Sequence, residues 1–237
     1  MSRLEELLQQ QKDIAAAIEV EVAKGRAAAA QGQADAQFNL GQMHEKGQGV
    51  PRSYPEAMRC YKQAADQGSA PAQFCLGVLF EKGRGEAEDF VQALHWYQLA
   101  AAQGSAPAQC ALGALFENGQ GTKQDFAEAM RRYKLAAALG HAASQCNLGR
   151  IYENGLGVRR DYAEAMRWYR MAAEQGNASA LSNLGFMFDH GQGVEQDDAR
   201  ALMYYNKAAK RGDAYAIKNR DMIEARVAAR AAPKAVA

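Results

Sequence analysis

Residues 148–176 read LGRIYENGLGVRRDYAEAMRWYRMAAEQG, a segment with a Leu-Gly pair, a Gly-x-Gly pair, a tyrosine, paired alanines and a closing glycine. The same signals return every 36 residues, five times, without an insertion or a deletion. The Leu-Gly pairs begin at Leu40, Leu76, Leu112, Leu148 and Leu184, and the tyrosines are Tyr61, Tyr97, Tyr133, Tyr169 and Tyr205. A fixed period of this length is typical of repeat proteins, in which each repeat is one supersecondary unit.

Each repeat carries the signals of two helices. In the second copy, Ser69 is placed to accept an amide of the first helical turn, and apolar residues follow at helical spacing as far as Gly83. Glycine at that point permits the left-handed backbone conformation that ends many helices. The residues equivalent to Ser69 are Ser105, Asn177, Asp213 and the weaker cap His141.

The second helix of each repeat has its own start signal. The capping positions are Ser53, Asp89, Asp125, Asp161 and Asp197, and three residues after them stand Glu56, Gln92, Glu128, Glu164 and Arg200. Four of these five pairs fit the capping box, in which each residue bonds the other's backbone amide. An apolar stripe then includes Tyr97, which we expect to fill the space beside the small alanines.

One pair of helices cannot bury both of its apolar faces, so successive pairs must stack to form a continuous core. The sequence therefore predicts an all-α fold, an α/α superhelical solenoid of five 36-residue helix-pair repeats with N- and C-terminal capping helices. The predicted parts are an N-terminal helical cap (1–32), five repeats (33–68, 69–104, 105–140, 141–176 and 177–212), a C-terminal capping helix (213–230) and a disordered tail (231–237).

Composition narrows the functional classes. Of 237 residues, 48% are hydrophobic and 23% are charged, and the net charge is +1. This balance favours a folded chain and disfavours a protein that binds nucleic acid through its phosphates. No apolar run approaches the ~20 residues that cross a bilayer, and residues 1–13 lack the pattern of a secretory signal. We therefore expect no nucleic-acid partner, no membrane insertion and a cytoplasmic location, where the four cysteines would be reduced.

The repeated string resembles the Sel-1-like repeat, a relative of the tetratricopeptide repeat with a longer loop between its helices. The departures are local, since Glu86 and Thr122 replace a valine of the loop, and His44 and Asp198 replace aromatic residues. The resemblance implies an α/α superhelix that acts as an adaptor or scaffold. It places the chain in a family linked to signal transduction, to protein quality control at membranes and to bacterial–host interaction.

The two ends of the chain carry separate signals. Leu4, Leu8, Ala15, Ile18 and Val22 follow a heptad-like line. Residues 1–31 are therefore interpreted either as a cap on the first repeat or as a helix for self-association. From position 200 onward nine basic residues stand against three acidic ones, which indicates either a solvated helix face or a weak site for an anionic partner.

No catalytic, cofactor-binding or metal-binding residues are predicted. The Gly-x-Gly pairs lack the Gly-Lys-Ser/Thr of a P-loop and are interpreted as helix ends. Some Sel-1-like repeat proteins are described as β-lactamases, but no serine of this chain begins the Ser-x-x-Lys motif. The four histidines, His44, His95, His141 and His190, occupy unrelated positions of the repeat, whereas zinc needs three or four converging ligands. Cys60 and Cys75 lie on neighbouring predicted helices, so the sequence does not exclude a disulfide between them.

In tetratricopeptide-like arrays the first helices line the concave side, and alignment on Leu-Gly gives three columns of residues there. The first column is Phe38, Phe74, Cys110, Cys146 and Ser182, the second is Gln42, Val78, Ala114, Arg150 and Phe186, and the third, the acidic column, is Glu45, Glu81, Glu117, Glu153 and Asp189. The predicted partner-binding residues are Phe38, Gln42, Glu45, Phe74, Val78, Glu81, Glu117, Arg150, Glu153, Phe186 and Asp189.

Two alternatives are open on this surface. The acidic column either attracts a basic peptide or plays a structural role by bonding the following loop. The apolar patch formed by Phe38, Phe74 and Val78 either binds a partner or contacts the N-terminal helix.

The expected function is that of a non-enzymatic scaffold or adaptor, which binds a peptide or protein segment in its concave groove and uses no cofactor. Apolar anchors would supply affinity, and the charged columns would supply specificity. Two other functions are weighed against it. One is a regulator or enzyme of cell-wall chemistry, which would need an activated nucleophile. The other is a structural subunit that self-associates through its N-terminal helix.

Overall fold

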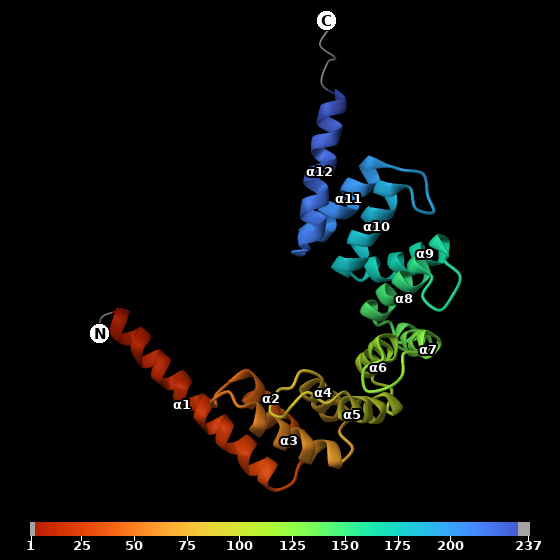
Figure 1. The fold of residues 1–237 in the computed structure, drawn as a ribbon. Helices are drawn as coiled ribbons and strands as arrows, with labels where there is room; N and C mark the ends of the chain where they lie inside the picture. Colours follow the sequence, from red (N-terminus) through yellow and green to blue (C-terminus); the bar gives the residue numbers. More distant parts are fainter. Residues whose placement is uncertain (1–2, 232–237) are drawn as a thin grey trace, which may run out of the picture. The chain divides into compact units, whose positions relative to one another are not determined.

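The computed structural model describes the backbone of residues 3–231 and, within that segment, all side chains except those of Leu4, Ala15, Ile18, Glu21 and Ala231. This described part contains twelve α-helices and no strand (Figure 1). The first helices of the repeats are α2 (Ala34–Lys46), α4 (Ala70–Glu81), α6 (Ala106–Asn118), α8 (Ala142–Asn154) and α10 (Ala178–His190). The second helices are α3 (Tyr54–Asp66), α5 (Phe90–Ala102), α7 (Phe126–Ala138), α9 (Tyr162–Glu174) and α11 (Asp198–Ala209). Helix α1 (Arg3–Ala30) precedes the repeats and α12 (Ala214–Ala231) follows them, so the predicted α/α solenoid with a capping helix at each end is confirmed.

The chain forms two compact units, residues 1–124 and residues 125–237, with the boundary between the two helices of the third repeat. In the first unit each helix from α1 to α6 packs against the next, and in the second unit each helix from α7 to α12 does the same. Each unit therefore has the nearest-neighbour packing of a repeat array. Residues 232–237 of the predicted disordered tail lie outside the described residues.

Capping side chains start the second helix of every repeat, as predicted. The capping acceptors are Ser53, Asp89, Asp125, Asp161 and Asp197. Among the first helices, Asn177 accepts from the Ala180 N–H at 2.8 Å, and His141 accepts from Ser144. Ser69 does not act as predicted, because its side chain makes no capping bond, and the same holds for Gln33 at the start of α2.

At Ser53, Asp89 and Asp161 the reciprocal bond of the predicted capping box is not formed, because the backbone N–H donates to another group. The backbone N–H of Asp89 donates at 3.0 Å to the carbonyl of Phe80, which lies in the last turn of the preceding helix. The N–H groups of Ser53, Asp161 and Asp197 donate in the same way to His44, Tyr152 and Phe188, each at 2.9 Å. These bonds tie each second helix to its own first helix. The glutamates pair with arginines instead, in Glu56–Arg59, Glu128–Arg131 and Glu164–Arg167.

The repeat tyrosines lie on the glycines of the Leu-Gly pairs. A Cβ atom built on Gly77 would lie 2.6 Å from the Tyr97 ring, and one built on Gly149 would lie 2.5 Å from the Tyr169 ring. No larger residue fits at such distances, so glycine is what lets the two helices of a repeat approach each other. All five tyrosines are at most 1% exposed, which confirms that they fill the core.

Only the second half of α1 packs against the repeats. Val22 and Ala29 are buried, and Ala29 clusters with Leu40 and Cys60. The exposed apolar residues of α1 are Leu7, Leu8, Ile14 and Val20, each about half exposed. Of the heptad-like line, Leu8 is thus exposed and Val22 is buried, while the side chains of the other three residues lie outside the described ones.

Helix α12 ends the array because it lacks the Leu-Gly pair. The positions 36 residues after Leu184 and Gly185 are occupied by Arg220 and Asp221. These two charged side chains bond each other at 2.6 Å, and Asp221 is exposed. The opposite face of α12 packs into the core through Ile223. An apolar face inward and a charged face outward are what a capping helix needs.

Candidate partner-binding surface

The acidic column is hydrogen-bonded to the tyrosines of the second helices. The Tyr97 hydroxyl donates to Glu81 Oε2 at 2.6 Å, 16 residues earlier in the chain. The equivalent bonds are Tyr61 to Glu45 at 2.7 Å and Tyr169 to Glu153 at 2.5 Å. These contacts favour the structural alternative for the column, with a tyrosine rather than the loop as the bonding partner. Glu117 belongs to the same column and is buried, 8% exposed.

These tyrosines stay protonated. Burial, followed by the hydrogen bond to the adjacent carboxylate, raises the pKa of Tyr61, Tyr97 and Tyr169 well above the ordinary value for a phenol. A phenol that is neutral at any physiological pH can donate continuously to its glutamate. Each pair is therefore a permanent link between the two helices of a repeat.

The fifth member of the acidic column has a different partner. Asp189 is 7% exposed and accepts from Arg226 of α12 at 2.6 Å. Arg226 also binds Asp198, which in turn binds Arg230 at 2.8 Å. The hydroxyl of Tyr205 is buried and has no hydrogen-bond partner among the described residues. Together with Arg200 and Arg220, which pair with Asp197 and Asp221, four residues of the predicted basic C-terminal surface are engaged with carboxylates of the chain itself.

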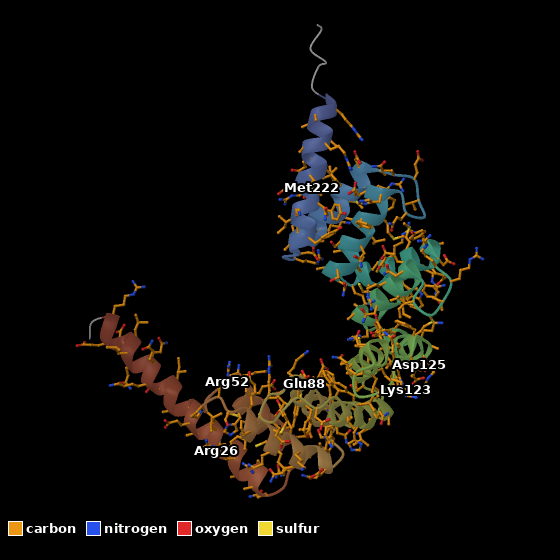
Figure 2. The ribbon with its side chains drawn as sticks, viewed as in Figure 1. Arg26, Arg52, Glu88, Lys123, Asp125 and Met222 are labelled. Atoms are coloured by element: carbon orange, nitrogen blue, oxygen red, sulfur yellow. The ribbon has the colours of Figure 1, made fainter. Side chains whose placement is uncertain are left out.

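The second column is half-buried in every repeat, whereas the acidic column includes the buried residues Glu117 and Asp189. Gln42, Arg150 and Phe186 are half-buried. Phe186 stacks on His190 of its own helix, with ring centroids 4.0 Å apart. The second column continues onto α12 at Met222, which is 51% exposed and is labelled in Figure 2. Within the first column, Cys146 and Ser182 are buried, so the column does not form a uniform surface.

The apolar patch is half-buried against tyrosines. The ring centroid of Phe38 lies 5.8 Å from that of Tyr61, and that of Phe74 lies 5.7 Å from that of Tyr97. Phe74 and Val78 both pack on the core cluster that contains Tyr97. The cluster that contains Ala29 of α1 includes Leu40 and Met43 rather than Phe38. These contacts favour a patch that faces a partner over one that α1 covers.

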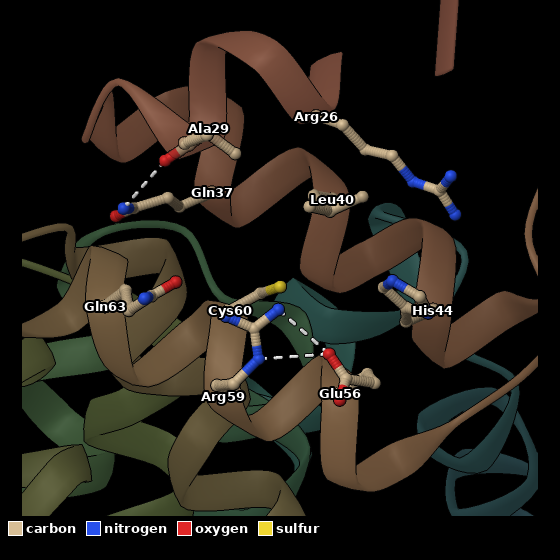
Figure 3. A pocket seen from close by; sticks show the side chains of 10 residues that line it. Arg26, Ala29, Gln37, Leu40, His44, Glu56, Arg59, Cys60 and Gln63 are labelled. Carbon is tan, nitrogen blue, oxygen red and sulfur yellow. Dashed lines mark hydrogen bonds and ion pairs between the residues drawn. The ribbon is translucent and has the colours of Figure 1, made fainter. Parts of the chain in front are cut away.

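A pocket of about 420 Å³ lies where α1 meets α2 and α3 (Figure 3). Cys60 lies on one wall, and Arg59 on the same helix pairs with Glu56 at 2.9 Å. Arg26 and His44 belong to the opposite helices, α1 and α2. The ion pair already satisfies Glu56, and burial raises the pKa of the Cys60 thiol. A protonated thiol is a weak nucleophile.

Cys60 and Cys75 are free thiols, so no disulfide joins them. Burial raises the pKa of Cys75 to about 11. In the described part of the chain, no three His, Cys, Asp or Glu side chains gather as metal ligands would. The helices described there also include none with the length and apolar character of a membrane span.

The family follows from a comparison with known repeat profiles. The Sel1 repeat matches at residues 34–69, 70–105, 106–141, 142–177 and 178–213. The chain belongs to the Sel1 repeat family. Sel1 repeats generally form non-catalytic scaffolds that mediate protein–protein interaction. No curated protein matches this Sel1 repeat chain.

Solved Sel1 repeat structures share the fold. A protective antigen of uropathogenic Escherichia coli with an SLR fold is 38% identical, with a TM-score of 0.75, over 81% of this chain and 41% of that one. The chain therefore spans less than half the length of that protein. A Sel1 repeat protein from Oxalobacter formigenes is 32% identical, with a TM-score of 0.76, over 84% of this chain and 87% of that one. An immunity protein from Pseudomonas aeruginosa is 21% identical, with a TM-score of 0.56, over 83% and 81% of the two chains, which shows the fold alone.

A row of buried glutamines is the feature of these Sel1 repeats that the sequence reasoning missed. Gln73 donates to the Ala65 carbonyl at 3.2 Å and accepts from Gln103 at 2.8 Å. Gln37 and Gln145 have the same kinds of partners in their repeats. The signal was present, because glutamine recurs at 36-residue spacing where polar residues are rarely buried. It would have predicted a bond between successive repeats.

Proposed function

We propose that this Sel1 repeat protein is a non-enzymatic adaptor that holds a peptide or protein segment against the first helices of its repeats. The observation that carries the proposal is the half-buried apolar patch of Phe38, Phe74 and Val78, which lies on α2 and α4 of the first unit. Apolar side chains that remain accessible on an otherwise polar surface are typical of sites for protein partners.

Contrast between the columns supports this assignment. The acidic column keeps a carboxylate in every repeat, and its described contacts fix helix to helix. The second column changes from Gln42 through Val78 to Arg150 at equivalent positions. Side chains that vary in size and charge at one structural position are not fixed by one shared packing contact, so we expect them to be the ones that select a partner. The acidic column then supplies a negative field close to them.

The test is affinity purification from the native cell with the parent chain and a Phe38→Ala/Phe74→Ala/Val78→Ala variant. We expect the parent to recover a protein partner and the variant to recover at least about tenfold less of it, because three apolar anchors are lost. A matched control is Leu99→Ala/Leu135→Ala, which removes exposed apolar side chains from second helices. Equal recovery by the parent and the patch variant, with helical content unchanged, would refute the proposed surface.

A second function, self-association, is favoured by one observation on α1. Leu7, Leu8 and Ile14 are 52%, 49% and 57% exposed, on the half of α1 that does not pack on the repeats. We expect a Leu7→Gln/Leu8→Gln/Ile14→Gln variant to have the mass of a monomer where the parent has that of a dimer, measured by light scattering after gel filtration. A parent chain that is itself monomeric at about 100 µM would remove this function, and the adaptor proposal would be unaffected.

We also propose a reducing compartment such as the cytoplasm, and this rests on the cysteines. Cys60 and Cys75 are not joined by a disulfide, and burial raises the pKa of Cys75. Thiols of this kind persist where disulfides are not favoured.

A further inference from the structure

The second repeat contains a pocket that the proposed adaptor surface does not use. It has a volume of about 410 Å³ and lies between α3, α4, α5 and the loop that precedes α5. The apolar residues that line it are Met58, Leu76, Phe80 and Trp96. The charged and polar residues that line it are Lys62, Glu86, Glu88, Asp89 and Gln92, with Glu88 labelled in Figure 2. Three carboxylates against one ammonium give the pocket a negative balance.

At one position, the loop before α5 has a charged residue where the equivalent loops of the first and fifth repeats have an apolar one. Val50 and Val194 occupy that position in the first and fifth repeats, where Val50 is 7% exposed and Val194 packs on the core. In the second repeat the residue is Glu86, which is exposed. An apolar wall is thus left next to a carboxylate instead of next to a valine. This combination suits a ligand with both an apolar stem and a positive charge.

The fifth repeat shows what fits such a pocket. Its equivalent pocket is lined by Phe188, Asp197 and Arg200 among others, at positions 108 residues after Phe80, Asp89 and Gln92. The guanidinium of Arg200 lies 5.3 Å from the centroid of the Phe188 ring, and its Nε lies 3.0 Å from Asp197 Oδ2. Cation–π contact and a charged hydrogen bond therefore hold an arginine of the chain itself at the rim of the pocket, where its side chain is 63% exposed.

The second repeat keeps two of these three elements. Phe80 supplies the ring, and Asp89 supplies the capping carboxylate. The capping bonds use Oδ1 of Asp89, which accepts from the Val91 and Gln92 N–H groups at 2.9 Å, and the equivalent aspartate of the fifth repeat also caps through Oδ1. The third element is missing, because Gln92 stands in place of the arginine, and Glu86 and Glu88 add negative charge.

Trp96 adds a buried hydrogen-bond donor to the wall of the pocket. Its side chain lines the pocket and the residue is 9% exposed, yet the indole N–H has no acceptor among the described residues. A buried donor without an acceptor is unfavourable by about 1–3 kcal/mol. A carbonyl of a bound peptide is the kind of group that would satisfy it.

We propose that this pocket binds an arginine side chain from a peptide segment of a partner, with the guanidinium on the Phe80 ring and Asp89, and with Glu86 and Glu88 beside it. The methylene groups of the arginine lie against Met58 and Leu76. The site is separate from the first-helix patch, so it gives the adaptor a second contact of defined chemistry. It predicts a preference for arginine over lysine, because the planar guanidinium stacks on a ring while it pairs with a carboxylate.

The test uses the fluorescence of Trp96 in the full chain with Trp168→Phe, which leaves one tryptophan. The probes are three blocked tripeptides, Gly-Arg-Gly, Gly-Lys-Gly and Gly-citrulline-Gly, titrated to about 20 mM. We expect a saturable change with the arginine peptide, a Kd at least about tenfold weaker with citrulline, and an intermediate Kd with lysine. Absence of a saturable change, or equal binding of arginine and citrulline, would overturn the proposal, and equal binding of arginine and lysine would overturn the choice of arginine.

Two variants make the result specific. Gln92→Arg should place the chain's own arginine in the pocket, as in the fifth repeat, and abolish peptide binding while the melting temperature stays the same or rises. Glu86→Val introduces the residue that the first, fourth and fifth repeats have at this position and should weaken binding about tenfold. A Gln92→Arg chain that binds the peptide like the parent would contradict the assignment. Phe74→Ala should leave peptide binding unchanged, so failure of the arginine site and failure of the first-helix surface are distinguishable.

Discussion

A single hydrogen bond distinguishes the repeats most sharply. Tyr97 donates to Glu81, whereas Tyr205 has no acceptor, because Asp189 is one methylene shorter and binds Arg226 instead. Helical periodicity identified both residues of each pair as belonging to fixed positions. Periodicity did not predict the hydrogen bond between them, because that bond depends on how two helices pack and not on the spacing of residues within either helix. The same limit applies to the glutamine row, where Gln73 donates to the Ala65 carbonyl of the preceding repeat.

The tyrosine bond leads to a paired prediction. Tyr97→Phe removes a donor from a carboxylate that is mostly buried, so we expect the free energy of unfolding to fall by about 1–2 kcal/mol. Tyr205→Phe removes a hydroxyl that has no partner, so we expect a change within about 0.5 kcal/mol or a small gain. Urea denaturation followed by circular dichroism measures both. An equal loss in the two variants would show that the hydroxyl bond to Glu81 contributes nothing.

Helices were the most predictable level of the structure, since their ends depend on local chemistry. Asp89 and Asp161 cap helices as expected because a carboxylate beside a helix N-terminus needs only its own turn. The reciprocal bond failed because the Asp89 amide already donates to Phe80 in the neighbouring helix. The close approach at Gly77 was visible in the sequence only as a conserved spacing of Leu-Gly between copies, and its cause is the Tyr97 ring.

Two glycines of helices should respond in opposite ways to the same substitution. Gly77→Ala places a methyl group 2.6 Å from the Tyr97 ring, so we expect destabilisation by about 1–3 kcal/mol despite the higher helix propensity of alanine. Gly25→Ala in α1 meets nothing within 4 Å, so we expect a gain of about 0.5–1 kcal/mol. Thermal unfolding of both variants compares them directly. Stabilisation by Gly77→Ala would contradict close packing of the two helices.

In the chain as a whole, some positions of the repeat carry the same residue in every copy and others differ between copies. Its period predicted the solenoid, both capping helices and the absence of strands, because stacked pairs are the only way to bury a stripe that recurs in every copy. The partner surface was less predictable, since Phe38 and Phe74 also pack on tyrosines and Cys146 is buried in its column. The pocket proposed for arginine could not be predicted from the sequence, although Glu86 departs there from the family pattern. It depends on comparing two copies in three dimensions.

Hydrogen–deuterium exchange of the full chain, measured with and without the purified partner, reports directly whether the first helices hold that partner. We expect slower exchange in α2 and α4, around Phe38, Phe74 and Val78, and little change in the faces of second helices that carry Leu99 and Leu135. Protection confined to the second helices, with α2 and α4 exchanging as in the free chain, would contradict the account.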